Sequence, residues 1–390
     1  MKILQFVTSL DPNAGGTVRA LVDLGNGLAA LGHTVSVVAP DSSATPPGWL
    51  ENTASVKMLS VGKPSLFGLA IPPGAQDILI REMQSADVLH VHGVWSYTNI
   101  LVCRLAARLR KPFVISLHGM LDDWPMRQSR LRKRLFLTLL GNRWLSAAAR
   151  IHVTAQLEFE QSRKWFPERL GVVIPNLLDM APFRCLPDAR IIEPYLHRLA
   201  PKRARVLFLS RLHPKKGLEI LLRASALLKS RGRPVNIIVA GDGTANYRRT
   251  LISLARELEL CDDEVIFLGP ITGDLKLALY RSCDVFALPT HHENFGYVLV
   301  EALACGVCLI TTRGVAIATE LHSTGAAVLA DATPEGFAEA IDTLLVDRKS
   351  LHARGEVGRQ RALAWFDGQQ IIRQYEQMYF HCVGQDLGCS

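Results

Sequence analysis

Short apolar runs alternate with helical patterns along most of this chain of 390 residues, and this alternation limits the possible folds more than any other feature. Apolar strands that alternate with helices indicate a parallel sheet covered by helices on both faces. In the first half, strands are expected at residues 2–10, 34–40, 56–61, 87–93, 113–119, 150–155 and 171–176. Helices are expected at residues 17–31, 75–84, 97–110, 126–148 and 155–164. The first half therefore predicts one Rossmann-like α/β domain.

The alternation stops at a charged segment with four prolines and then starts again. Further strands are expected at residues 205–210, 235–243, 264–269, 284–290, 308–311 and 326–330. Helices are expected at residues 217–230, 245–260, 274–282 and 297–305, and again up to about residue 381. The predicted organisation is a Rossmann-like domain at 1–178, a linker at 179–204, a second such domain at 205–366 and a helical end at 367–390. Ligands bind such sheets at the carboxyl ends of the strands, so two facing sheets place a ligand in the cleft between them.

The net charge of +8 fits either an anionic partner or charge that keeps the protein soluble. The charge is uneven, because the stretch from Trp124 to Leu157 contains no Asp or Glu. The basic residues in that stretch are Arg127, Arg130, Arg132, Lys133, Arg134, Arg143 and Arg150. A basic amphipathic helix over residues 124–144 can lie on an anionic membrane surface, or it can be a core helix with a solvated basic face. We expect no nucleic-acid partner.

The N-terminal segment, the apolar runs and the cysteines indicate the cellular compartment of the protein. The first apolar run stops at Asp11, which favours a β-strand over a signal peptide. No run of about 18 apolar residues exists, so no membrane span is expected. The eight cysteines are scattered, which suits reduced thiols in the cytosol, and the C-x-x-C of Cys305 and Cys308 lacks the second ligand pair of a zinc site. We expect a cytoplasmic protein that can bind peripherally to the inner face of the membrane.

Three loops that follow strands carry glycines or cations. Gly16 lies in a glycine-containing loop before the first helix, whose free N–H groups favour an anion, although a plain turn is an equal alternative. Arg211 and Lys216 flank a turn that opens a helix, and two such cations can hold a diphosphate or can simply be solvated. Gly241 lies in a tight turn against which a nucleotide base can pack, and this signal is weak by itself.

Two further constellations carry carboxylates and a histidine. Glu293 lies in the loop after a buried strand, and Glu301 follows eight residues later in a helix, so both can bind vicinal hydroxyls of a sugar or ribose. The alternative is one surface and one helical glutamate without a ligand. His118 closes a buried strand and is either a core residue or a group at the reacting centre. His90 and His92 are interpreted as structural, because no third metal ligand is apparent.

Seven segments in order resemble retaining glycosyltransferase family 4, which has the GT-B fold of two Rossmann-like domains facing each other across a cleft. The strongest element is Glu293-x(7)-Glu301 followed by Ala-Cys-Gly. The other segments are the Gly15–Gly16 loop, GHTVSVVAP at 32–40, SLHG at 116–119, IPN at 174–176, SRLHPKKG at 210–217 and AGDG at 240–243. The chain departs from the family at Cys308, where a proline is common, and at residues 17–19, where many members have an acidic residue.

The resemblance implies a role for each of these positions. Arg211 and Lys216 would hold the donor diphosphate, and Glu301 would bind the ribose hydroxyls. Glu293 would contact the transferred sugar, and His118 would touch it near the reacting carbon. Gly16 would face the phosphates or the acceptor, and the last helix would return to the first domain. The remaining donor-side positions are Gly241, Asn294, Phe295 and Gly296.

The resemblance predicts a retaining hexosyltransferase that uses a nucleotide-diphosphate sugar, a sugar or lipid-linked acceptor, and neither a metal nor another cofactor. The pathway expected from family habit is cell-surface, exopolysaccharide or glycolipid biosynthesis. Asp122–Asp123 and Asp262–Asp263 are not part of an Asp-x-Asp loop, so they are interpreted as charged surface turns. Two alternatives stay open, namely a GT-B-like nucleotide-sugar epimerase and a non-catalytic nucleotide-sugar-binding protein.

Overall fold

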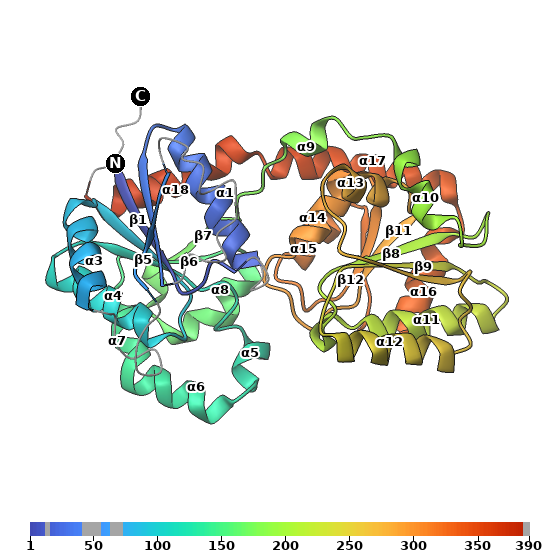
Figure 1. The fold of residues 1–390 in the computed structure, drawn as a ribbon, viewed down its shortest axis with the longest axis horizontal. Helices are drawn as coiled ribbons and strands as arrows, with labels where there is room; N and C mark the ends of the chain where they lie inside the picture. Colours follow the sequence, from blue (N-terminus) through green and yellow to red (C-terminus); the bar gives the residue numbers. More distant parts are fainter. Residues whose placement is uncertain (12–15, 41–55, 63–72, 385–390) are drawn as a thin grey trace. The chain divides into compact units, whose positions relative to one another are not determined.

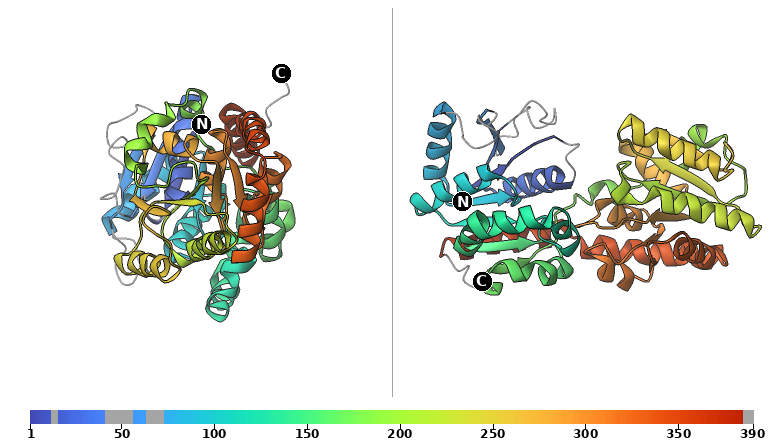
Figure 2. Two further views of the ribbon diagram at one scale, coloured as in Figure 1. Left: turned by 90° about the vertical axis from the view of Figure 1, so that its right-hand side faces the viewer. Right: turned by 90° about the horizontal axis from the view of Figure 1, so that it is seen from below.

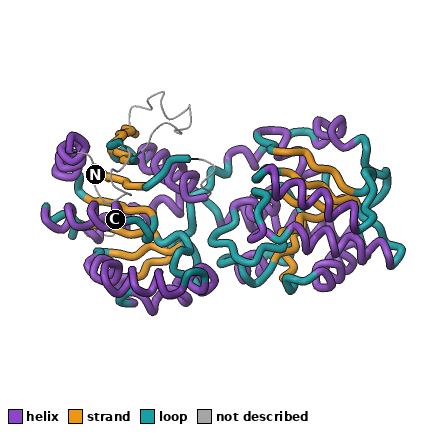
Figure 3. Tube along the Cα trace, turned by 60° about the horizontal axis from the view of Figure 1, so that its bottom comes forward, coloured by secondary structure: helices purple, strands orange, loops and turns teal. Residues whose placement is uncertain are grey.

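The computed structural model describes residues 1–11, 16–40, 56–62 and 73–384, and it divides into two compact units (Figure 1). Unit 1 comprises Met1–Asp179 and Phe366–Ser390, and unit 2 comprises Met180–Trp365. In each unit a sheet of strands lies among helices (Figure 3). Each predicted strand segment contains a strand. Central strands such as β4, β9 and β11 are buried along their whole length, which explains their continuous apolar runs.

Unit 1 contains a seven-stranded parallel sheet in the order β3-β2-β1-β4-β5-β6-β7. Its strands are β1 Lys2–Val7, β2 Thr34–Ala39, β3 Val56–Ser60, β4 Val88–His92, β5 Phe113–Ser116, β6 Arg150–Val153 and β7 Gly171–Val173. Its longer helices are α1 Gly16–Ala30, α3 Pro73–Ser85, α4 Tyr97–Arg108, α8 Gln156–Ser162 and α18 Gly368–Cys382. The chain order reverses between β1 and β4, where open sheets of this kind bind ligands beyond the carboxyl ends of the strands.

Unit 2 contains a six-stranded parallel sheet in the order β10-β9-β8-β11-β12-β13. Its strands are β8 Arg205–Leu209, β9 Asn236–Ala240, β10 Val265–Gly269, β11 Val285–Leu288, β12 Cys308–Thr311 and β13 Ala327–Leu329. Its helices include α11 Leu218–Ser230, α12 Ala245–Glu257, α13 Gly273–Arg281, α14 Tyr297–Ala304, α15 Ala318–Ser323, α16 Pro334–Leu345 and α17 Arg348–Trp365. The corresponding reversal lies between β8 and β11, so the loops after these two strands are the expected ligand-binding loops of this unit.

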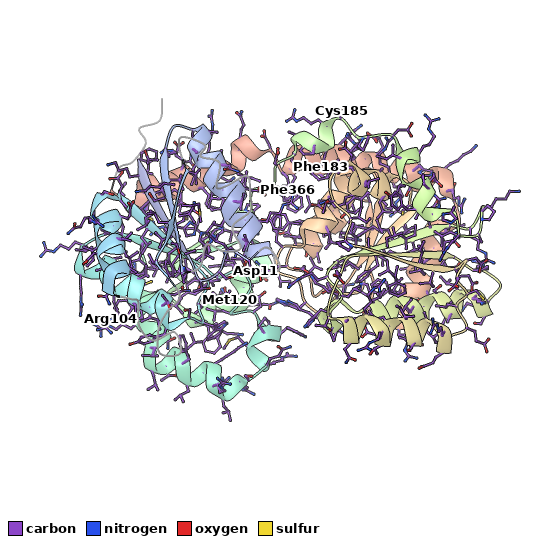
Figure 4. The ribbon with its side chains drawn as sticks, in the orientation of Figure 1. Asp11, Arg104, Met120, Phe183, Cys185 and Phe366 are labelled. Carbon is purple, nitrogen blue, oxygen red and sulfur yellow. The ribbon has the colours of Figure 1, made fainter. Side chains whose placement is uncertain are left out.

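The segment interpreted as a linker is structured and belongs to unit 2. It forms α9 Ala181–Arg184, a 3-10 turn at Ala189–Ile192 and α10 Glu193–Leu196. Phe183 and Leu196 are buried, so apolar side chains fasten the segment despite its prolines. In Figure 4, Phe183 and the exposed Cys185 mark this segment.

The helix expected at 126–148 is interrupted. Residues Asp123–Arg127 form α5, and Ser129 adopts a left-handed φ of 55° that ends the first turn. The chain then continues as α6 Arg130–Phe136, a π-helical turn at Leu137–Gly141 and α7 Asn142–Ala147. Asp122, interpreted as part of a surface turn, is instead 2% exposed. That interpretation was wrong because the turn packs against α8, whose Gln161 side chain accepts a hydrogen bond from the Asp123 N–H at 3.0 Å.

Helix α18 packs on unit 1, to which the chain returns at Phe366 (Figure 4). Glu376 accepts a hydrogen bond from His33 at 2.7 Å, and an ideal Cβ at Gly27 would lie 3.0 Å from Ile372 of this helix. The close approach explains a glycine in the middle of α1. Within the described ranges, no helix is both long and apolar enough to cross a membrane.

Candidate functional site

The loop after β8 brings two cations to the carboxyl edge of the unit 2 sheet. Its backbone is tied to the loop after β9, because the Leu212 N–H donates to Asp242 O at 2.7 Å. The 3-10 turn Pro214–Lys216 is capped by His213, whose Nδ1 accepts from the Lys215 N–H at 3.1 Å. Arg211 is exposed and Lys216 is 9% exposed. Of the two predicted cations, Lys216 is therefore the buried one.

Gly241 is the residue that lets these two loops approach each other. Its φ is 125°, and an ideal Cβ would lie only 1.9 Å from the carbonyl oxygen of Ser210. Any side chain would therefore force the two loops apart and would also be strained in this conformation. This geometry gives a structural reason for the glycine, and packing of a nucleotide base against Gly241 stays a prediction.

The loop after β11 places Glu293 next to Lys216, at the carboxyl edge of the unit 2 sheet. The His291 N–H donates to Lys215 O at 2.9 Å, so the loops after β8 and β11 are joined through their backbones. The Nζ of Lys216 donates a hydrogen bond to Oε2 of Glu293, and the two side chains are 11% and 19% exposed. Burial raises the pKa of Glu293, but the charge and hydrogen bond of Lys216, with the charge of Lys215, outweigh it and hold that pKa below its ordinary value. Glu293 is therefore an ionised carboxylate.

Residues 294–296 lie directly before the N-terminus of α14. Gly296 has a φ of 78° and forms the N-terminal cap of this helix. An ideal Cβ there would lie 3.1 Å from Cγ of Glu293, so the glycine also makes room for that side chain. Phe295 is buried and packs edge-on against Tyr297, with ring centroids 5.0 Å apart. Asn294 is half-buried beside them.

Glu301 is completely buried and both of its oxygens are engaged. Lys276 Nζ donates to Oε1 at 2.9 Å, and the hydroxyl of Tyr280 donates to Oε2 at 3.0 Å. Burying a carboxylate is costly unless it is paired and hydrogen-bonded, so these two partners explain why it is tolerated. Sequence reasoning did not find Lys276 and Tyr280. Their spacing of four on α13, directly after β10, places them on one face and was the available signal.

In unit 1, His118 follows β5 with a left-handed φ of 52°. Its Nε2 lies 2.9 Å from Nδ1 of His92, and the two rings are nearly parallel at 18°. The next residue, Gly119, donates its N–H to Glu158 at 2.6 Å and so holds the turn. Burial, and then the nearby His152, lowers the pKa of His118 to about 3, so its ring is neutral near pH 7.

A buried network of hydrogen bonds connects Ser116, two residues before His118, to helix α18. Ser116 Oγ lies 2.6 Å from His90 Nε2 and 2.6 Å from His152 Nδ1. His90 Nδ1 lies 2.7 Å from the hydroxyl of Tyr379, and His152 Nε2 lies 3.0 Å from that of Tyr375. The structural interpretation of His90 fits these contacts, whereas His92 touches the predicted site residue directly. Gly16 is the exposed first residue of α1, and residues 12–15 of its loop lie outside the described residues.

Among the described residues, Cys261, Asp263 and Glu264 form one cluster of three side chains that could hold a metal ion. Glu264 already accepts hydrogen bonds from Lys229 at 2.8 Å and from Arg203 at 3.2 Å, and these cations repel a metal ion. The group is better described as an ion-pair cluster. The thiols of Cys305 and Cys308 are buried, and burial raises their pKa values to about 12 and about 11.

Two protein families match the chain, one in each half. Residues 15–176 match the Glycosyl transferase 4-like domain, and residues 196–361 match Glycosyl transferases group 1. Among solved structures, Anabaena HepE in complex with UDP and glucose has a TM-score of 0.78 and 24% identity, covering 96% of this chain and 98% of its own. WaaG, a glycosyltransferase involved in lipopolysaccharide biosynthesis, has a TM-score of 0.72 and 17% identity, covering 97% and 99%. The two units therefore have the α/β architecture of the GT-B fold.

Curated relatives carry the name D-inositol 3-phosphate glycosyltransferase. The protein of Salinispora tropica is 34% identical over 233 residues, which are 56% of this chain and 47% of the relative. That of Kineococcus radiotolerans is 27% identical over 383 residues, which are 90% and 87% of the two chains. The chain spans about half the length of the first of these relatives. These similarities support a GT-B glycosyltransferase.

Proposed function

We propose that the chain is a retaining family 4 glycosyltransferase that transfers a hexose-type sugar from a nucleoside-diphosphate sugar to an acceptor hydroxyl. The observation that carries this proposal is the buried pair of Lys216 and Glu293 at the reversal point of the unit 2 sheet. A phosphate-binding cation and a hydroxyl-binding carboxylate in contact match the two ends of a sugar–phosphate bond. The resemblance to HepE with UDP and glucose supports the same class of donor.

The donor enters by exchanging partners with this pair. The diphosphate takes Lys216 as counterion, with Arg211 as a second cation from the same loop, and Glu293 turns to the hydroxyls of the transferred sugar. The donor therefore replaces one ion pair by another, which limits the cost of desolvating Lys216. Glu301 accepts hydrogen bonds from the ribose hydroxyls, beside those it already receives from Lys276 and Tyr280. Gly16, Gly241 and residues 294–296 provide close backbone approach to the donor.

In the reaction, the bond between the anomeric carbon and the phosphate oxygen breaks and its electron pair leaves with the nucleoside diphosphate. Lys216 and Arg211 stabilise that developing charge. The acceptor oxygen attacks the oxocarbenium-like carbon from the face that the phosphate leaves, and its proton passes to the leaving phosphate. Retention therefore needs no covalent nucleophile. We expect no metal requirement, because the two cations supply the positive charge, and His118 hydrogen-bonds the transferred sugar.

For the acceptor, we propose a hydroxyl of a sugar or a lipid-linked sugar in cell-surface or exopolysaccharide assembly. The name of the curated relatives adds an inositol phosphate as a second acceptor to be tried. A panel of nucleotide sugars, scored for binding and slow hydrolysis, identifies the donor first. Acceptors are then tested with that donor, and the anomeric configuration of the product is determined by NMR. An inverted product would contradict the retaining assignment, and donor isomerisation without acceptor would favour an epimerase instead.

Substitutions of Lys216 and Glu293 test whether this pair belongs to the active site. Lys216→Met and Glu293→Gln should each lower turnover more than about tenfold, which corresponds to 1.4 kcal/mol. Lys229→Met is the matched control, because Lys229 pairs with the buried Glu264 of the same unit but lies outside the proposed site. Near-normal turnover in the first two variants, or an equal loss in the control, would remove the pair from the site.

We also propose that unit 1 binds an anionic lipid surface through α6 and the π-helical turn that follows it. Helix α6, whose residues are all described, has no fully buried side chain, and Lys133 and Phe136 are the half-buried residues that contact the rest of unit 1. Leu131, Leu135 and Leu139 are 84%, 59% and 68% exposed, and their spacing of four places them along one side. Figures 1 and 2 show α6 projecting from unit 1. Exposed leucines among arginines match a membrane interface, which takes apolar side chains and attracts cations.

Vesicle co-sedimentation tests this surface. We expect salt-sensitive binding to anionic vesicles and little binding to neutral ones, since each basic residue near the surface contributes about 1 kcal/mol. Replacing Leu131, Leu135 and Leu139 by Gln should abolish binding. Val346→Gln is the control, because this side chain is 78% exposed on unit 2. Equal binding to neutral and anionic vesicles, or unchanged binding of the triple variant, would refute the proposal.

A further inference from the structure

The two ring nitrogens that face each other in the contact between His92 and His118 share one proton. The Nδ1 of His92 and the Nε2 of His118 lie 2.9 Å apart, so one of the two nitrogens donates and the other accepts. Burial lowers the pKa of His92, with the neighbouring His90 adding to the effect, and the pKa of His118 is lowered to about 3. Both rings are therefore neutral, and each carries one proton. Fixing the proton of one ring fixes that of the other.

The surroundings of His92 decide between the two arrangements. His92 is 3% exposed, and its Nε2 has no hydrogen-bond partner among the residues that the structure describes. If His118 donated, the proton of His92 would be on this Nε2 and would form a buried N–H without an acceptor. If His92 donates, Nε2 is a bare nitrogen. Buried N–H groups without a partner are rarer in proteins than unsatisfied acceptors, so the second arrangement is favoured.

The ring of His92 cannot easily rotate into an orientation in which Nε2 would find an acceptor. It lies between the rings of His90 and His118, with centroids 4.3 Å and 5.2 Å away and nearly parallel planes. The side-chain amide of Asn99 donates to His92 O at 3.4 Å and to Gly93 O at 2.7 Å, which holds the backbone at the end of β4. The register of β4 with β5, which pairs His92 with Ser116, fixes the two strand ends relative to each other.

We infer that His92 is a positioning residue that donates its Nδ1–H to His118 and thereby holds His118 in the tautomer protonated on Nδ1. His118 then offers a neutral N–H donor, and no basic nitrogen, at the ring position that remains for a ligand. Resting on the proposed function, this makes His118 a donor of a hydrogen bond to an oxygen of the transferred sugar. It cannot take the acceptor's proton, which agrees with the transfer of that proton to the leaving phosphate.

The tautomer is measured directly on the wild-type protein with ¹⁵N-labelled histidine. Long-range ¹H–¹⁵N spectra distinguish a protonated from a bare ring nitrogen, and His118→Asn identifies the signals by their loss. We expect Nδ1 of His118 to be protonated and Nε2 to be bare. A protonated Nε2 would overturn the inference. This result does not depend on turnover, so it stands or falls apart from the proposed function.

Two substitutions of His92 then test its role. His92→Phe keeps an aromatic ring beside His90 but removes the donor, so His118 is no longer held in the Nδ1–H form and the Nε2–H form should become populated as well. We expect kcat to fall about tenfold with KM changed less than about twofold. His92→Asn carries an amide N–H on Cγ, where His carries Nδ1, so most of kcat should return if the spectra show that this N–H restores the Nδ1–H tautomer of His118. A tautomer that stays wholly Nδ1–H in the Phe variant, or a loss of kcat in the Asn variant while His118 keeps the Nδ1–H tautomer, would overturn the assignment.

Calorimetry with a nucleoside diphosphate measures whether the His92 variants still bind the nucleotide. Because His92 lies in unit 1, all variants should keep the wild-type affinity for the nucleotide as long as they are folded. If turnover is absent in every variant and in the wild type while the tautomer is as expected, the proposed function fails and the inference about His92 stands.

Discussion

Glu301→Gln separates the structural from the ligand-binding role of the buried carboxylate. The amide oxygen can accept from Lys276 as Oε1 does at 2.9 Å. The hydroxyl of Tyr280 also lies 3.2 Å from the carbonyl oxygen of Val298, so it can donate there and accept from the new amide N–H. The hydrogen bonds with Lys276 and Tyr280 can therefore be kept while the charge is lost. This exchange of charged for neutral hydrogen bonds costs about 1–2 kcal/mol.

That cost is small enough to leave unit 2 folded. At about 2–4 °C per kcal/mol for a domain of this size, the melting temperature should fall by about 2–8 °C. Glu301→Ala instead leaves the ammonium of Lys276 without its partner, and breaking such a pair costs about 3 kcal/mol or more. The two variants should therefore differ clearly in thermal unfolding. Similar melting temperatures would show that the proposed rearrangement around Tyr280 does not occur.

Calorimetry with a nucleoside diphosphate and its 2′-deoxy form tests the ligand-binding role. If Glu301 binds the ribose hydroxyls, the Gln variant should lose about 1.5–3 kcal/mol of affinity. It should also discriminate less between the two nucleotides than the wild type does. Glu264→Gln is the matched control, because Glu264 is 3% exposed and pairs with Lys229 in the same unit. Wild-type affinity in Glu301→Gln, or an equal loss in the control, would refute ribose binding by Glu301.

Three further outcomes are expected. Gly241→Ala should destabilise unit 2 by about 1–3 kcal/mol or more in thermal unfolding, since its Cβ would meet Ser210 O at 1.9 Å, and wild-type stability would contradict the contact. Unit 1 should lose stability as pH falls from about 6.5 toward 4, because His90, His92, His118 and His152 have lowered pKa values in the folded protein. The unfolded chain therefore binds more protons in this range, which costs up to about 1.4 kcal/mol per pH unit for each histidine. Glu158, whose pKa burial and Asp122 raise to about 7, opposes this as a single group, and a melting temperature that rises on acidification would refute the balance. Turnover should persist in EDTA, and its full loss with recovery on adding Mg²⁺ or Mn²⁺ would contradict the metal-independent mechanism.

Most of the fold could be predicted because parallel strands buried on both faces must be continuously apolar. The strands β4 and β9 are buried along their whole length and were visible as such runs. The short helices within 179–204 were not predicted, because the prolines and charges of this segment mask the apolar side chains of Phe183 and Leu196. The interruption at Ser129 was not predictable either, since a left-handed residue that is not glycine leaves no mark in the sequence.

The candidate site was predictable where loop position alone decides it. Lys216 and Glu293 follow β8 and β11, and the topology brings the ends of these strands together. The partners of Glu301 were missed, because the spacing of Lys276 and Tyr280 places them on one face of α13 but does not show that this face meets α14. The contact of His92 with His118 likewise depends on the register of two strands, which a single sequence does not give.

The two lysine–glutamate pairs explain how unit 2 tolerates so many charges near the ends of its strands. In the sequence, Lys216, Glu293 and Glu301 are equivalent candidates for a ligand. In the fold each carboxylate has a lysine as counterion, so the ligand-free site is held together by the same groups that are proposed to bind the donor. A buried charge without a partner would destabilise the empty protein by several kcal/mol. Pairing removes that penalty and keeps the side chains in place, so the donor has to exchange partners rather than order a flexible site.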